Sequence, residues 1–100
     1  MIARHWRGVA HAGRAQDYEQ HLRAETFPLL HRIPGFVDAA ILKRTVADGV
    51  EFLIVTRWQS MDAIRQFAGA DPEAAVVLPV VEAMMVDYDH RVTHYEVVAS

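Results

Sequence analysis

Residues 50–69 read VEFLIVTRWQSMDAIRQFAG and predict a buried strand that leads directly into a short helix. Phe52–Val55 is an unbroken apolar run, which is typical of a central strand covered on both faces. Trp58 ends this strand. Ser60 is a suitable N-cap because its hydroxyl can accept a hydrogen bond from a free N–H of the first turn, and Gly69 is a suitable helix stop. Apolar residues recur at helical spacing between the two, at Ile64, Phe67 and Ala68.

Three other segments have the pattern of strands. They are Ile2–Gly8, which Gly8 ends, Phe36–Val46 and Val92–Val98. Pro34-Gly35 is a turn before the second of these, and Asp48-Gly49 predicts a hairpin that joins Phe36–Val46 to the central strand.

The first helix is predicted from Gly13 to about Thr26, because apolar residues form one stripe along it. Pro28 is expected to kink or end the helix, since it has no backbone N–H to donate and its ring clashes with the preceding turn. Leu29 and Leu30 then form a bent last segment.

The last third of the chain is less regular. Asp71-Pro72-Glu73 has the features of a helix start, with Ala74–Leu78 as its continuation and Pro79 as its interruption. The conformation of Val80–Val86 stays open. Asp87–Asp89 is predicted to be a loop before the last strand.

The predicted order is strand, helix, strand, strand, helix, strand. With right-handed crossovers this order gives one α+β domain over residues 1–100, a ferredoxin-like antiparallel four-stranded sheet with helices on one face. The strands are not cleanly polar on their other side, so we expect a second copy to cover it and to form a dimeric α+β barrel.

Composition excludes several classes of protein. The chain has 100 residues, no cysteine and a net charge of −3, with its basic residues scattered. Disulfides, thiolate metal sites and a cysteine nucleophile are therefore excluded, and nucleic acid and anionic membranes are poor partners. No apolar run is long enough to span a membrane and no signal peptide precedes the first strand, so a cytoplasmic location is expected.

Five stretches together resemble the antibiotic biosynthesis monooxygenase superfamily, and more narrowly a branch of small bacterial proteins. They are residues 2–8 (IARHWRG), 34–36 (PGF), 58–60 (WQS), 64–69 (IRQFAG) and 94–97 (HYEV). The resemblance implies a dimeric barrel with a pocket between helices and sheet for a flat aromatic molecule or a haem. It also implies that oxygen is activated without a bound flavin or metal, so no cofactor is expected.

Haem-degrading members of the superfamily carry an asparagine on the first strand, a tryptophan at the end of the short helix and a histidine on the next helix. This sequence has no asparagine, has Phe67 where that tryptophan would fall, and has no histidine between His31 and His90. Haem degradation by that triad is not expected here.

The first strand carries polar residues that need partners. Alternation sends His5 and Arg7 to one face of the sheet and Trp6 to the other. Because an unpaired buried charge is costly, the polar pair either meets an acid such as Glu51 or Glu96 or faces a cavity.

Four more residues are candidates for a pocket. Trp58 and Phe67 are core residues or pocket walls, Tyr18 can donate or accept a hydrogen bond, and His94 has an ordinary pKa suited to a base. His94 lies four residues from His90, about 13 Å along a strand, so no metal site is expected. Asp17, His21 and Glu25 form a ridge that is either a solvated helix face or a pocket border.

Two functions from different classes follow. The first is a cofactor-independent monooxygenase acting on an aromatic or quinol-type molecule, with Trp6, Tyr18, Trp58 and Phe67 as walls. His94 or His5 would be the base, and Arg7 would stabilise the anion. The alternative is a non-catalytic homodimeric barrel that binds a small apolar metabolite or a partner.

Overall fold

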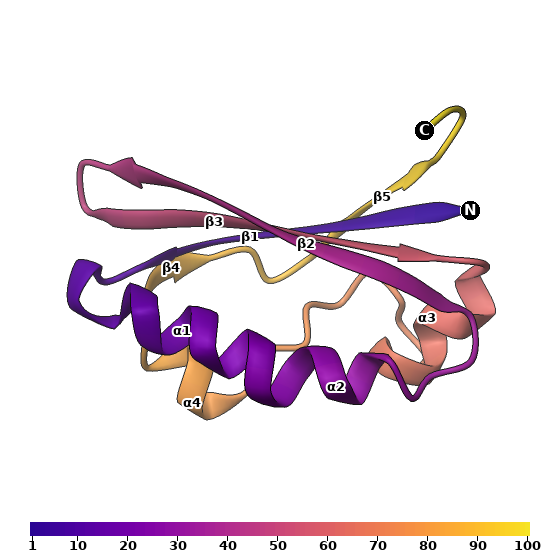
Figure 1. Cartoon of the computed structure of the whole chain (residues 1–100), viewed down its shortest axis with the longest axis horizontal. Helices are drawn as coiled ribbons and strands as arrows, with labels where there is room; N and C mark the ends of the chain where they lie inside the picture. The colour runs from indigo at the N-terminus through magenta and orange to yellow at the C-terminus, as the bar shows by residue number, and fades with distance from the viewer.

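A single antiparallel sheet organises the molecule (Figure 1), and the computed structural model describes residues 1–100. Its strands are β1 (Ile2–Ala10), β2 (Phe36–Val46), β3 (Gly49–Trp58), β4 (Met85–Tyr88) and β5 (Thr93–Glu96). The order across the sheet is β2-β3-β1-β4, and β5 also pairs with β1. This is the ferredoxin-like order that the sequence predicted.

The predicted hairpin joins β2 to β3, with Val46 opposite Gly49. Gly49 begins the strand instead of standing in the turn, and its φ is 157°. A Cβ atom there would collide with the backbone oxygen of Ala10. This glycine therefore allows β3 to lie close to the end of β1.

Two short strands share the other edge of β1. β4 pairs with Gly8–Ala10 and β5 with Ile2–His5, so together they act as one interrupted fourth strand. The predicted loop over Asp87–Asp89 is wrong for its first two residues, and the predicted Val92–Val98 strand is shorter than expected. Pairing with the free edge of β1 outweighs the local preference of aspartate for loops.

The first helical arm runs without a break beneath β2 and β3. It contains η1 (Ala12–Arg14), α1 (Ala15–His21), the π-helical turn η2 (Leu22–Thr26) and α2 (Phe27–Leu30). Pro28 does not end the helix, and the wider η2 turn just before it accommodates the residue that lacks an N–H. The arm thus reaches Leu30, as the expected last segment.

The second group of helices differs from the sequence prediction. α3 (Met61–Ala68) starts at Ser60, whose hydroxyl accepts a hydrogen bond from Ala63 N at 3.2 Å, as expected. No helix starts at Asp71, because Ala74 forms a β-bridge with Arg91. Pro79 begins a helix instead of interrupting one, since a proline suits the first turn of α4 (Pro79–Glu82).

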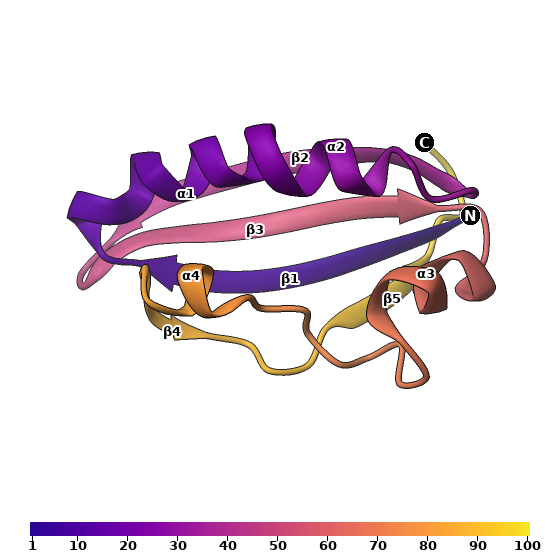
Figure 2. The same ribbon diagram turned by 90° about the horizontal axis from the view of Figure 1, so that it is seen from below.

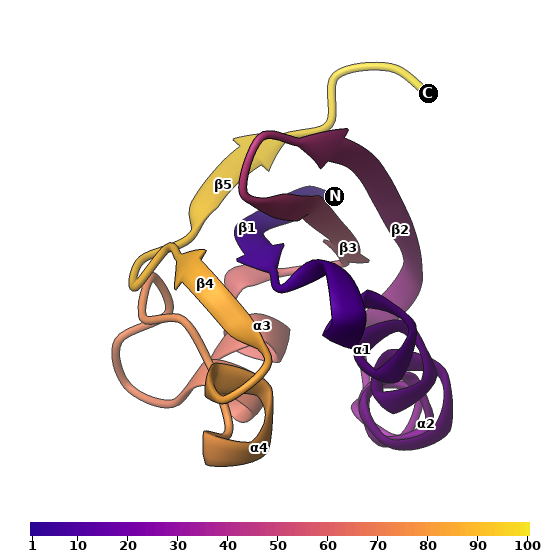
Figure 3. The same ribbon diagram turned by 90° about the vertical axis from the view of Figure 1, so that its left-hand side faces the viewer.

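Both helical groups lie on the same face of the sheet, with the arm beneath β2 and β3 and with α3 and α4 beneath the β4–β5 edge (Figures 2 and 3). Leu30, Trp58 and Ile64 join α2 and α3 to the end of β3 in one buried cluster. The opposite face of the sheet carries no helix. No helix in the structure is long and apolar enough to cross a membrane.

Candidate functional site

A cavity of about 670 Å³ lies between the two helical groups. Its floor is the helix-side face of β1 and β3, with Arg4, Trp6, Ile54 and Thr56. One wall is the helical arm and the other is the segment from Val76 to Val81. The lining is mostly hydrophobic, as expected of a site for a small organic molecule.

Three aromatic side chains predicted as pocket walls do line this cavity, namely Trp6, Tyr18 and Phe67. The ring centroids of Trp6 and Tyr18 are 6.1 Å apart. The indole Nε1 of Trp6 donates a hydrogen bond to the carbonyl oxygen of Asp89 at 2.9 Å, which fixes the ring. Burial raises the pKa of Tyr18, so its hydroxyl stays protonated and can donate a hydrogen bond.

The strand glycine Gly8 makes room for the Trp6 ring. A Cβ atom at this position would overlap the indole. Gly8 does not end β1, which continues to Ala10. The predicted strand end is therefore corrected, and the glycine is explained by the close approach of its neighbour.

Trp58 lies behind the cavity, not in its wall. The side chain is fully buried, and its Nε1 donates to Thr56 Oγ1 at 2.8 Å. It stacks on Phe67 with a centroid separation of 6.0 Å, so Phe67 stands between Trp58 and the cavity. Trp58 was predicted to be either a core residue or a pocket wall, and the structure shows a core residue.

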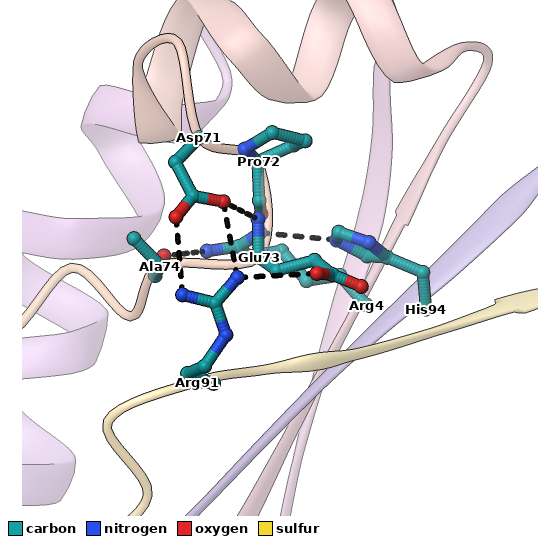
Figure 4. Close-up of polar contacts among 7 residues, drawn as sticks. All are labelled: Arg4, Asp71, Pro72, Glu73, Ala74, Arg91 and His94. Atoms are coloured by element: carbon teal, nitrogen blue, oxygen red, sulfur yellow. Dashed lines mark hydrogen bonds and ion pairs between the residues drawn. The ribbon is translucent and has the colours of Figure 1, made fainter.

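Arg4 is the charged group that the sequence reasoning missed. The residue is only 4% exposed and lines the cavity, yet it has no carboxylate partner. Its Nη1 donates to the carbonyl oxygen of Pro72 and to His94 Nε2, and its Nη2 donates to Ala74 O at 2.8 Å (Figure 4). These bonds use three of the five N–H donors of a guanidinium.

The surroundings of Arg4 leave its charge without a compensating carboxylate at the cavity. Burial lowers the pKa of Arg4 to about 10, so the side chain is still charged near neutral pH. The guanidinium carbon lies 5.7 Å from the centroid of the Phe67 ring. A buried cation between an aromatic face and an apolar cavity is suited to bind an anionic oxygen.

His94 lies on β5 next to Arg4 but is not among the cavity-lining residues. Burial and then the Arg4 charge lower the pKa of His94. The imidazole is therefore neutral near pH 7 and accepts from Arg4 at 3.0 Å through Nε2. His94 also borders a separate hollow near Gln59 and Met61.

His5 and Arg7 lie on the other face of the sheet. Strand alternation places them opposite Arg4 and Trp6, away from the cavity. Arg7 Nε donates to Glu51 Oε2 at 2.8 Å, which is the structural pairing considered for it. His5 packs on Tyr95 with ring centroids 4.9 Å apart. The structure thus does not bring His5 and Arg7 together with His94.

Sequence comparison decides the family. The family model described as antibiotic biosynthesis monooxygenase matches residues 1–76. The chain belongs to this family. Among functionally curated proteins, none matches the sequence.

Solved structures of antibiotic biosynthesis monooxygenase relatives share the fold. A family member from Bacillus cereus is 19% identical, with a TM-score of 0.69 over 100% of this chain and 94% of that one. A haem degrader from Mycobacterium tuberculosis with two haems in its active site is 18% identical, with a TM-score of 0.69 over 100% and 98%. A monooxygenase from Streptomyces coelicolor bound to nanaomycin D is 17% identical, with a TM-score of 0.58 over 94% and 81%.

The predicted helix ridge of Asp17, His21 and Glu25 lies partly at the cavity and partly on the surface. His21 and Glu25 line the cavity, and His21 is the one histidine among the lining residues. Asp17 instead pairs with Arg14 at 3.0 Å on the surface. No group of three or more His, Asp or Glu side chains is placed to hold a metal ion.

Proposed function

We propose that the protein is a cytoplasmic, cofactor-independent monooxygenase that oxidises a quinol-type aromatic molecule in this cavity. One observation carries the proposal, namely the buried Arg4 guanidinium, without a carboxylate partner, at an apolar cavity with aromatic walls. An apolar site favours a flat aromatic ligand, and the cation favours its ionised form.

The chemistry draws every electron from the substrate. A quinol and dioxygen give a hydroxyquinone and water, so C₆H₆O₂ and O₂ become C₆H₄O₃ and H₂O. Ionisation of the quinol comes first, because the anion transfers an electron to oxygen more readily than the neutral molecule. One atom of oxygen forms the new C–O bond, and the other leaves as water with the two protons.

Five of the cavity-lining residues have a role in this proposal. Trp6 and Phe67 hold the faces of the ring, and the protonated Tyr18 hydroxyl donates to a substrate oxygen. Arg4 stabilises the ionised oxygen, and His21 accepts the proton that it loses. In this proposal His94 holds Arg4 in position and is not the base, because its Nε2 already accepts a hydrogen bond from Arg4.

Two observations favour a quinol over a haem. The sequence has none of the three residues that haem-degrading members are expected to use, as set out above. Arg4 is also the one buried charged residue in the cavity lining, since the lining residues Glu25 and Arg32 are exposed. His5 and Arg7 have no part in the reaction because they face the other side of the sheet.

We further propose that two copies pair through the helix-free face of the sheet. This face carries apolar side chains from adjacent strands, including the half-exposed Leu42 and Tyr95 and the partly buried Leu53 and Val55. Arg7, Glu51 and Arg44 form ion pairs at one end of it. We also propose that residues 1–100 form one domain, since β4 and β5 complete the sheet and bring His94 to Arg4.

Oxygen uptake tests the function. Purified protein is mixed with 1,4-naphthohydroquinone prepared under nitrogen, and oxygen consumption above the spontaneous rate is measured. Arg4→Gln is expected to lower the rate about a hundredfold, as for loss of a group that stabilises developing negative charge. Arg7→Gln is the matched control because it makes the same change on the same strand, on the opposite face.

Labelling with ¹⁸O₂ completes the test. One labelled atom in the hydroxyquinone and one in water support monooxygenation. Uptake no faster than the spontaneous reaction for a panel of one-ring and two-ring quinols would contradict it. Binding of those quinols without turnover would favour the non-catalytic binding barrel.

A further inference from the structure

The segment that holds Arg4 presents two opposite chemistries. The carbonyl groups of Pro72 and Ala74 point inward and accept hydrogen bonds from the Arg4 guanidinium. The side chains of Asp71 and Glu73 are exposed, and their carboxylates meet Arg91 (Figure 4). Two carboxylates thus adjoin, in the sequence, the two residues whose carbonyl groups bind the buried Arg4, and neither carboxylate pairs with it.

Arg91 forms ion pairs with both carboxylates. Its Nη1 donates to Asp71 Oδ2 at 3.0 Å, and its Nη2 donates to Asp71 Oδ1 at 3.2 Å and to Glu73 Oε2 at 3.1 Å. The two Asp71 contacts form a bidentate pair, which fixes direction as well as charge. The Arg91 hydrogen bonds lower the pKa of Asp71, so this carboxylate stays ionised.

Backbone pairing fixes Arg91 in place opposite the segment. Ala74 and Arg91 form an antiparallel β-bridge. On either side of the bridge, Val92 N donates to Glu73 O at 2.8 Å and Ala75 N donates to His90 O at 2.9 Å. The backbone of Arg91 is therefore held at a position from which its side chain reaches both acids.

The ion pairs of Arg91 with Asp71 and Glu73 affect Arg4 through electrostatics. No carboxylate forms an ion pair with Arg4, and burial alone accounts for its lowered pKa. Glu73 nevertheless lies between Pro72 and Ala74, whose carbonyl oxygens both accept hydrogen bonds from Arg4. Its charge also acts on the neighbouring His94 and opposes the lowering of that pKa. A Glu73 carboxylate released from Arg91 would be an intramolecular competitor for the Arg4 charge.

We propose that Arg91 is a positioning residue that holds Asp71 and Glu73 away from Arg4 and so leaves Arg4 free to bind the anionic oxygen of a planar aromatic acid or ionised phenol. This inference deepens the function proposed above and rests on it for the identity of the natural ligand. It concerns binding alone, so it can be tested without turnover.

The test compares a charged probe with its neutral counterpart. Calorimetry near neutral pH measures the affinity for 2-naphthoate and for 2-naphthamide, which have the same ring and nearly the same shape. The unmodified protein is expected to prefer the carboxylate, and Arg91→Gln to weaken 2-naphthoate about tenfold, equivalent to roughly 1.4 kcal/mol. Affinity for 2-naphthamide stays unchanged in this variant.

A combined variant separates positioning from simple loss of structure. Arg91→Gln with Asp71→Asn and Glu73→Gln removes the released charges together with the residue that held them. The amide oxygen of Asn can still accept the hydrogen bond that Asp71 accepts from Glu73 N. Affinity for 2-naphthoate is expected to return to that of the unmodified protein, and Arg91→Lys, which keeps the charge, to lie between the two.

Three results would overturn the inference. One is an unchanged preference for 2-naphthoate in Arg91→Gln. Another is a combined variant as weak as Arg91→Gln, because a purely structural role would not be rescued by removing acids. The third is failure of the unmodified protein to distinguish the two probes. If the protein shows this binding pattern but no oxygen uptake, the result would contradict only the proposed function.

Discussion

Arg4 Nη1 and His94 Nε2 lie 3.0 Å apart, so a buried cation donates to a neutral imidazole. The arrangement requires that Nε2 carries no proton, which leaves the ring proton on Nδ1. Because protonation of His94 would place two positive charges together, the pair is stable only while the histidine is neutral. His94 thereby holds Arg4 without cancelling its charge.

Titration of the six histidines should reveal this relationship. Burial and Arg4 both lower the pKa of His94 from its ordinary value of 6.5, so its imidazole signal in NMR spectra should move at lower pH than an ordinary histidine. Arg4→Gln should raise the pKa of His94 toward the ordinary value. Arg7→Gln, on the other face, should not change it.

The same shift fixes a pH dependence of stability. The folded-state pKa lies below the unfolded value, so the unfolded chain binds more protons between the two values. This contribution to stability is present above about pH 6.5 and is lost as the pH falls through that interval. Urea unfolding at several pH values measures it, and a loss as steep in Arg4→Gln as in the unmodified protein would contradict the contribution of the Arg4 charge.

Gly8→Ala should disturb the cavity floor. The added methyl group overlaps the Trp6 indole, so the ring must move toward the cavity. We expect a loss of roughly 1–3 kcal/mol in the free energy of unfolding, as for other overpacked sites. Tryptophan fluorescence should shift as well. The control is Gly13→Ala, where the new methyl group meets nothing within 4 Å.

Leu42→Asp tests the proposed dimer. Leu42 is 51% exposed on the helix-free face, so the change puts a charge into the proposed sheet-to-sheet contact with little effect on a monomer. Light scattering after gel filtration should show monomers for this variant and dimers for Leu29→Asp. Leu29 is 55% exposed on the helical arm and serves as the matched control. A monomeric unmodified protein would contradict the proposal.

Much of the fold follows from local signals in the sequence. The Ser60 cap, the apolar run of β3 and the hairpin before it each depend on nearby residues, and each is found in the structure. The chain after Gly69 does not follow its local signals, because Asp71-Pro72-Glu73 has the residues of a helix start but forms no helix. Its backbone instead pairs with residues 90–92, a contact that no local pattern reports.

The cavity was predicted more successfully than its charged group. Trp6, Tyr18 and Phe67 are large, and burial of large aromatic groups is predictable from residue type. Alternation along β1 separates Trp6 from Arg7, and the same rule places Arg4 on the face of Trp6. That signal was available in the sequence. The carbonyl groups that satisfy Arg4 were not, because they come from an irregular segment about 70 residues away.

Ionisation of a bound phenol tests the role of Arg4 most directly. The absorbance of 2-naphthol, which does not consume oxygen readily, is followed against pH in the presence of saturating protein. An apolar cavity alone would raise the pKa of the phenol, whereas a neighbouring cation lowers it by about one to three units. We expect the bound phenol to ionise about one unit or more below the free phenol, and Arg4→Gln to reverse the shift. A pKa unchanged or raised in the unmodified protein would contradict activation of the substrate by Arg4.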